Sequence, residues 1–287
     1  MGAKSKSVMC DTVLFPNVVE RQKAQLFYRS GDQALEKAIG DCLKTNRIPV
    51  SLPQLVDARI ATGNAERVLW TDSYDTSSIM VFGRTKKGKP VVAFDHGPHY
   101  FFEPGTISKA REAGFVDGMG KMPRDEFYTL LDREDKESVF VVDYVRLQQA
   151  NNEQYNLSHA LGHCLTLPLF GDLERAEQYF LCIKSKHVEA LSYVACPNIF
   201  EYALKEGVLA AFESELESGP LALFLGLKGV ASYERGGSDG YKRLFPFYST
   251  ERFDSKNVRV LGLAHQGATP IDPRSLGMPG GRNSEEM

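Results

Sequence analysis

Two short apolar runs separated by a charged turn form the clearest pattern in the chain. Residues 79–82 and 91–94 are apolar, and the sequence KKGKP lies between them. Gly88 can adopt a positive φ without a Cβ clash, and apolar runs joined by a short glycine-containing turn favour a β-hairpin. Pro98 has no N–H to donate to a sheet, so the second strand is predicted to end at Asp95 and to run into a loop.

Periodic apolar positions predict two helices before this hairpin. Ala34, Leu35 and Ala38 begin one stripe at helical spacing, behind the capping-box pattern SGDQ at residues 30–33. A second capping-box pattern, SLPQ at residues 51–54, precedes another apolar stripe. Because the connector between the two is short, they predict an N-terminal αα-hairpin.

The rest of the chain alternates between helical and extended patterns. Helices are predicted at 107–113, after Pro123, at 151–165, after Asp172 and from residue 198, the last either breaking at Gly207 or running to Leu216. Strands are predicted at 68–70, 138–145, 191–195, 221–230 and 258–264. This alternation, with one clear hairpin, predicts an α/β (mixed α+β) fold in which a mixed sheet containing a β-hairpin is covered by helices.

One globular domain is predicted to span residues 1–265. A subdivision near residue 150 is the alternative, although no linker-like composition marks that position. Residues 266–287 are rich in proline, glycine and charge, which predicts a disordered or surface-draped tail.

Composition restricts the partners and the compartment. The 287 residues carry a net charge of −3, without the basic excess that nucleic-acid binding needs. No apolar run is long enough to span a bilayer, and the N-terminus lacks a stretch of signal-peptide type. The five cysteines are widely spaced and form no CxxC motif, which favours a reducing, cytoplasmic location. Nothing in the composition indicates an oligomeric state.

The loop after the hairpin carries the first candidate site. Asp95, His96, His99 and Glu103 lie close together in sequence, and carboxylates and imidazoles are good ligands for Zn²⁺, Mn²⁺ or Fe²⁺. The alternative is a loop in which Asp95 accepts backbone N–H bonds and the histidines are exposed.

A pair of histidines forms the second candidate cluster. His159 and His163 are four residues apart, so on a helix they would share one face and could share a metal ion. The zincin motif HExxH is absent, because Ala160 stands where its glutamate would be. Two solvated surface histidines are the alternative.

Two further residues are candidates for catalysis. Cys196 precedes Pro197 and a predicted helix, whose positive end would lower the thiol pKa; a small buried apolar residue is the alternative. Asp143 is a carboxylate within an apolar run, and it is expected to be either a structural hydrogen-bond acceptor or a site residue. The glycine-rich residues 235–240 are compatible with an anion cradle but better explained by a flexible turn.

Three functions follow from these clusters. The first is a metal-dependent hydrolase in which Asp95, His96, His99, His159 and His163 hold a divalent ion, and Glu103 or Asp143 acts as general base. The second is a non-catalytic module that binds a small molecule or a protein partner. The third is an enzyme that uses Cys196 as its nucleophile.

Overall fold

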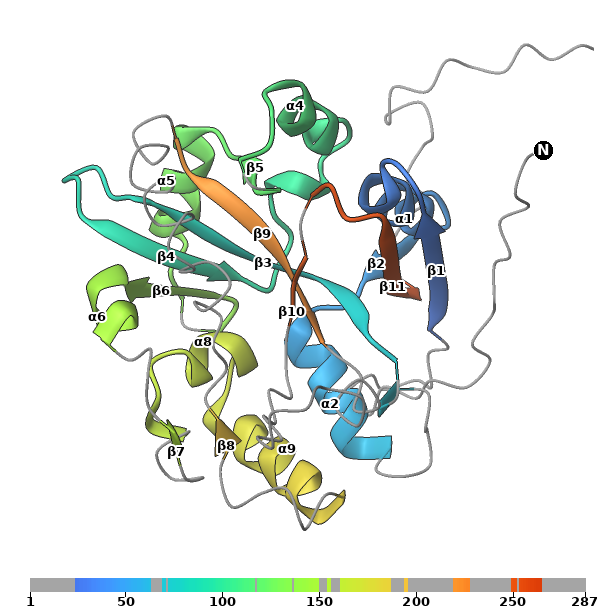
Figure 1. Cartoon of the computed structure of the whole chain (residues 1–287), viewed down its shortest axis with the longest axis vertical. Helices are drawn as coiled ribbons and strands as arrows, with labels where there is room; N and C mark the ends of the chain where they lie inside the picture. The colour runs from blue at the N-terminus through green and yellow to red at the C-terminus, as the bar shows by residue number, and fades with distance from the viewer. Residues whose placement is uncertain are drawn as a thin grey trace, which may run out of the picture.

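A nine-stranded mixed sheet runs through the described part of the protein (Figure 1). The computed structural model describes residues 24–62, 69–70, 72–116, 118–135, 137–149, 154–155, 161–186, 194–195, 219–227, 249–251 and 253–264. This arrangement confirms the predicted mixed α+β class with a mixed sheet.

The described elements have the following bounds. The strands are β1 (Gln25–Ser30), β2 (Arg47–Pro49), β3 (Tyr74–Arg84), β4 (Pro90–Asp95), β5 (Gly120–Lys121), β6 (Val139–Asp143), β7 (Gln154–Tyr155), β8 (Val194–Ala195), β9 (Leu221–Leu227), β10 (Ser249–Glu251) and β11 (Asn257–Ala264). The helices are α1 (Ala34–Lys44), α2 (Leu52–Thr62), the 3₁₀ helix η1 (Tyr100–Phe102), α4 (Thr106–Glu112), α5 (Arg124–Asp132), α6 (Tyr144–Gln149), α8 (Thr166–Phe170) and α9 (Leu173–Lys186).

Strand β3 holds the sheet together. The hydrogen-bonded order is β1-β11-β3-β4-β6, with β9 also paired to β3 and then to β10 and β5, and β2 paired to β11. The β3–β4 hairpin is antiparallel, with Ile79 opposite Asp95, and Gly88 in its turn has φ 81°. The predicted hairpin is therefore confirmed. The sheet is mixed because β3 and β11 run parallel.

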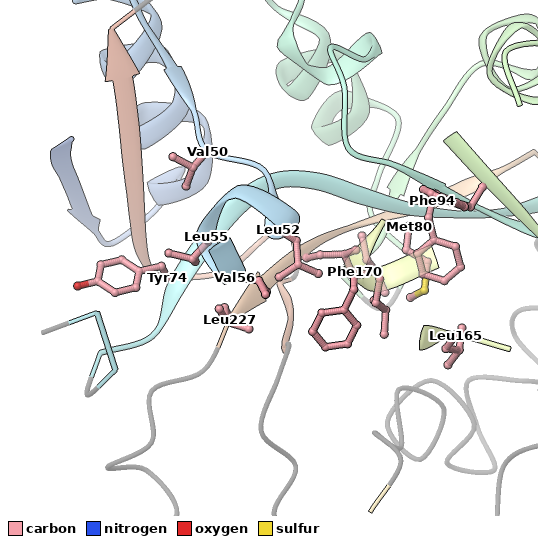
Figure 2. Close-up of a cluster of buried hydrophobic side chains, with 14 of the residues drawn as sticks. Val50, Leu52, Leu55, Val56, Tyr74, Met80, Phe94, Leu165, Phe170 and Leu227 are labelled. Carbon is pink, nitrogen blue, oxygen red and sulfur yellow. The ribbon is translucent and has the colours of Figure 1, made fainter. Parts of the chain in front are cut away.

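The two faces of the sheet carry separate apolar cores. Ile79 and Val81 of β3 pack into one core with α1, α4 and α5, which we call the α1 face. Met80 and Phe82 pack into the other with α2, α8 and α9, which we call the α2 face. Figure 2 shows part of the α2 face, where Leu52 and Phe170 lie with Met80 and Phe94. Since both faces of β3 are covered, its apolar run is continuous rather than alternating.

The first two helices form as predicted but do not pack as a pair. Strand β2 lies between α1 and α2 and joins the sheet at β11, so the helices cover opposite faces. The Ser51–Gln54 capping box is confirmed: the Ser51 N–H donates to Gln54 Oε1 at 2.9 Å, and the Gln54 N–H donates to Ser51 Oγ at 3.4 Å. The first capping box is wrong, because Gln33 at the N-cap is left-handed and makes no side-chain cap.

Some predicted elements differ from those in the structure, and others lie outside the residues that the structure describes. Residues 69–70 are helical rather than extended, and residues 154–155 form β7 rather than the start of a helix. The predicted helix at 198–216, the loop at 235–240 and the tail at 266–287 lie outside the described residues. The division into one domain or two stays a prediction.

Two observations bear on compartment and membrane. Among the helices that the structure describes, none is both long and apolar enough to cross a membrane. Within the same residues, Cys42 and Cys164 are free thiols.

Candidate functional site

A buried polar segment of β3, residues 75–78, lies against the loop that carries His96 and His99 and bonds to both histidines. A bulge interrupts the β3–β9 register between Asp75 and Ile79. Backbone groups of the neighbouring strands therefore bond to side chains of this segment. The Thr76 hydroxyl donates to the Leu225 carbonyl at 2.6 Å, and Asp75 Oδ2 accepts from the Arg259 N–H at 2.7 Å. These buried polar atoms are satisfied within the scaffold, as buried polar groups generally must be.

His96 is held at both ring nitrogens. Nε2 lies 2.6 Å from the Pro168 carbonyl oxygen, which can only accept, so Nε2 carries the proton. Nδ1 then accepts from the Ser78 hydroxyl at 2.7 Å, and Ser78 Oγ itself accepts the Leu52 N–H at 2.8 Å. Burial lowers the pKa of His96 to about 4, so the ring is neutral near pH 7.

His99 is fixed in the same way on the other face of the sheet. Its Nε2 donates to the Ser77 carbonyl at 2.7 Å, and its Nδ1 accepts the Phe101 N–H at 3.2 Å, which caps η1. The ring packs against Phe224 of the α1 face, whereas the His96 ring packs against Phe140 of the α2 face. Burial lowers the pKa of His99 to about 3. The two imidazoles therefore do not converge.

Asp95 is a fully buried carboxylate at the end of β4. Its Oδ1 accepts the Gly97 N–H at 2.8 Å, and its Oδ2 lies 3.4 Å from an Arg133 guanidinium nitrogen. Burial raises the pKa of Asp95, against the smaller opposing effects of these two partners. The alternative in which Asp95 accepts a backbone N–H is thus what the structure shows, although the neighbouring histidines are not exposed.

The two candidate general bases have different surroundings. The Glu103 side chain is exposed after η1. Asp143 pairs with Lys89 at 2.5 Å and accepts the Val145 N–H at 2.9 Å, and the Lys89 hydrogen bond lowers its pKa. Asp143 is opposite Val91 in the β4–β6 ladder, whereas Asp95 is opposite Val139, so the two carboxylates lie at opposite ends of that ladder.

The second histidine cluster is only partly described. His159 and Cys196 lie outside the described residues. His163 follows the end of a helical turn, and its Nδ1 accepts the Leu165 N–H at 3.2 Å. Among the described residues, His96 Nε2 and the Pro168 carbonyl form a hydrogen bond between the two regions.

No group of three or more His, Cys, Asp or Glu side chains in the described part of the chain could hold a metal ion. The description of the protein as metal-binding is therefore wrong for this part of the chain. Whether Asp95, His96, His99, Glu103, Asp143 or His163 contacts a ligand of another kind stays a prediction.

A buried arginine with two aromatic partners on the α2 face is not among the residues that the sequence singled out. Arg59 of α2 is fully buried, and its guanidinium donates to the Tyr179 hydroxyl at 2.9 Å and to the Asp72 carbonyl at 3.1 Å. It also lies 5.5 Å from the Trp70 ring centroid, and Trp70 stacks on Tyr179. The signal was the spacing: Arg59 follows Leu52 by seven residues and so lies on the buried stripe.

The comparisons with known proteins give one structural match. No family model matches the chain, and no curated protein matches it. The chain is similar to a solved structure described as "Accommodation of massive sequence variation in Nanoarchaeota by the C-type lectin fold". The TM-score is 0.63 at 26% identity, and the match covers 85% of this chain and 99% of that chain.

This similarity changes the functional interpretation. The matched structure is described by a C-type lectin fold and not as a hydrolase. The described residues also contain no group of side chains that could hold a metal ion. The prediction of a metal-dependent hydrolase is therefore wrong. The findings favour the second prediction, a module that binds a ligand.

Proposed function

We propose that this chain is a non-catalytic recognition module, in which a rigid sheet-and-helix scaffold presents a surface for a small molecule or a protein partner. The observation that carries the proposal is the match, across 85% of the chain, to a C-type lectin fold described as accommodating massive sequence variation. A scaffold that tolerates sequence variation suits recognition, because specificity can then change without a change of fold.

The hydrogen bonds of the candidate loop support the same proposal. His96 is half-buried and His99 is buried, and both neutral rings are bonded within the protein at both ring nitrogens. A general base must reach a substrate proton within hydrogen-bond distance, and these nitrogens are already occupied. In this proposal the loop stiffens the scaffold and takes no part in a reaction.

The sequence between β9 and β10 is our candidate for the recognition surface. The two strands that flank it are paired in the sheet, with Ser249 of β10 opposite Gly226 of β9. The 21 residues between Leu227 and Ser249 include five aromatic and four cationic side chains. Aromatic residues and arginine are the types enriched where proteins bind partners. These aromatic residues are Tyr233, Tyr241, Phe245, Phe247 and Tyr248.

The experiment screens the purified full-length chain against an oligosaccharide array and a displayed peptide library, and then measures hits by calorimetry. We expect saturable binding without chemical change of the ligand. Tyr241→Ala with Phe247→Ala should weaken binding at least tenfold while the melting temperature stays constant. The matched control is Tyr128→Ala on α5, which should bind like the parent.

Three outcomes would count against the proposal. Protein-dependent turnover of a bound ligand would show an enzyme, and single labelling of Cys196 by iodoacetamide near neutral pH would favour the nucleophile instead. Absence of saturable binding to either library would remove the support for recognition. A cytoplasmic location also stays a proposal, checked by counting reduced thiols in protein isolated under acid quench.

A further inference from the structure

A short chain of hydrogen bonds, which we call the His96 clasp, joins three elements of the α2 face. The Leu52 N–H donates to Ser78 Oγ, the Ser78 hydroxyl donates to His96 Nδ1, and His96 Nε2 donates to the Pro168 carbonyl. Leu52 begins α2, and amides at a helix start have no partner within the helix. The clasp thus ties α2 and α8 to the centre of the sheet.

A second proton on His96 is incompatible with this arrangement. Nδ1 would become a donor, and the Ser78 hydroxyl would have to turn its own proton away from the ring. The imidazolium would then be buried beside Phe140. Burial disfavours that charge most strongly and holds the pKa of His96 at about 4, with the Pro168 carbonyl opposing and Arg175 reinforcing the shift.

The charged groups around the clasp do not compensate such a proton. On the α2 and α9 side, Asp57 already pairs with Arg175 at 2.6 Å. On the side of β4 and α5, Asp95 pairs with Arg133. Helix α8 has the sequence TLPLF and residues 139–142 of β6 read VFVV, so neither offers a charge.

Release of the clasp would free helices α8 and α9, which together form one layer on the α2 face. Leu169 and Phe170 of α8 are buried against the α2 face, and Arg175 of α9 donates to the Phe170 carbonyl at 2.5 Å. Helices α8 and α9 are therefore linked to each other as well as to the sheet. His99 does not hold a comparable layer, because its partners are the sheet and its own 3₁₀ helix.

We propose that His96 is an acid-operated clasp: proton uptake by its imidazole detaches α8 and α9 from the sheet while the α1 face stays folded. His96 takes up its proton near its ordinary pKa of 6.5 when the layer is open, and at about 4 when it is closed. The population of the open form therefore rises by up to about 300-fold as the pH falls through this window.

The chain contains its own reporter for this opening. Trp70 is the one tryptophan in the sequence, it is 4% exposed, and it stacks on Tyr179 of α9 at a centroid distance of 5.7 Å. Detachment of α9 exposes Trp70 and shifts its fluorescence to longer wavelength. Far-UV circular dichroism reports the remaining sheet and α1.

The test is a pH titration of the full chain from pH 7.5 to 4 with both signals. We expect the Trp70 shift at higher pH than the loss of dichroism. His96→Gln keeps an N–H donor for the Pro168 carbonyl and cannot titrate, so the Trp70 midpoint should fall by at least one pH unit. His163→Gln, the control for the other histidine near α8, should leave the midpoint in place. An unchanged midpoint in H96Q, or a shift produced by H163Q instead, overturns the proposal.

A measurement on the unmodified chain covers the case in which H96Q does not fold. Hydrogen exchange is compared at pH 7 and pH 5, after correction for the intrinsic rate of each amide. Protection at residues 166–180 should fall at least tenfold more than protection at residues 35–43 of α1. An equal fall in both regions would show global loosening and overturn the proposal.

Discussion

Gly262 of β11 lies where three side chains leave no room for a larger residue. A Cβ built there would be 2.4 Å from Cys42 Sγ, 2.9 Å from Phe27 Cε2 and 3.1 Å from Arg47 Cβ. The glycine therefore allows α1 to approach the sheet closely, because backbone at this position touches side chains directly. The same residue type at Gly40 of α1 has open space around it.

Gly262→Ala should therefore lower the free energy of unfolding by about 1–3 kcal/mol, since the added methyl must displace packed atoms. Gly40→Ala should raise it by about 0.5–1 kcal/mol, because alanine is the better helix former. Urea unfolding measures both. Adding Cys42→Ala to Gly262→Ala should recover part of the loss; a strictly additive double variant would disprove the close contact.

At the same scale, long-range partners explain why the sequence wrongly predicts that the two histidines share a metal site. Asp95, His96 and His99 lie close together in sequence, and this closeness predicts a shared site. The position of each ring is decided by partners 18 to 72 residues away, namely Ser78, Pro168 and Ser77. Local sequence contains no information on such partners. Arg59 was readable in principle, because its spacing from Leu52 put it on the buried stripe.

At the scale of elements, two identical-looking helix starts behave differently. SLPQ at residues 51–54 forms a reciprocal capping box, whereas SGDQ at residues 30–33 does not, because Ser30 is still paired with Asn257 in the sheet. Strand pairing overrides the local preference. Apolar periodicity, by contrast, depends on the element itself, and it correctly predicted α1, α2, α4, α5, β9 and β11.

Serine substitutions test this difference between the helix starts. Ser51→Ala should lower the free energy of unfolding by about 1 kcal/mol, because the Gln54 N–H loses its acceptor. Ser30→Ala should change it by less than about 0.5 kcal/mol, because this serine caps nothing. Chemical denaturation of the two variants gives the comparison. Equal losses would mean that Ser30 caps α1 in solution.

At the scale of the whole molecule, acid should weaken the fold well above the ordinary range of carboxylates. Burial depresses the pKa of His96 to about 4 and of His99 to about 3, from 6.5. The unfolded chain then binds more protons, so the stability present above pH 6.5 is lost as the pH falls. Asp95 acts in the opposite sense, because burial raises its pKa and the folded protein holds that proton more tightly.

Between pH 7.5 and pH 5 the two histidines together should remove about 4 kcal/mol from the free energy of unfolding, roughly 2 kcal/mol each. Urea titrations at pH 7.5, 6.5 and 5 measure this slope. His96→Gln and His99→Gln should each reduce it by close to half, even where the variant is less stable at pH 7.5. A slope that neither variant changes would place the titrating groups elsewhere.

The pairing of β1 with β11 sets the order in which the protein can be completed during synthesis. Gln25 lies opposite Gly262 and Ser30 opposite Asn257, so β1 waits for a partner strand that is made more than 200 residues later (Figure 1). At about 5–20 residues per second, the ribosome needs on the order of 10–50 s to supply that partner. Throughout this interval Phe27 and the apolar side of α1 lack the cover that Val258 and Val260 of β11 provide. We therefore expect the nascent chain to be most prone to aggregation until β11 emerges.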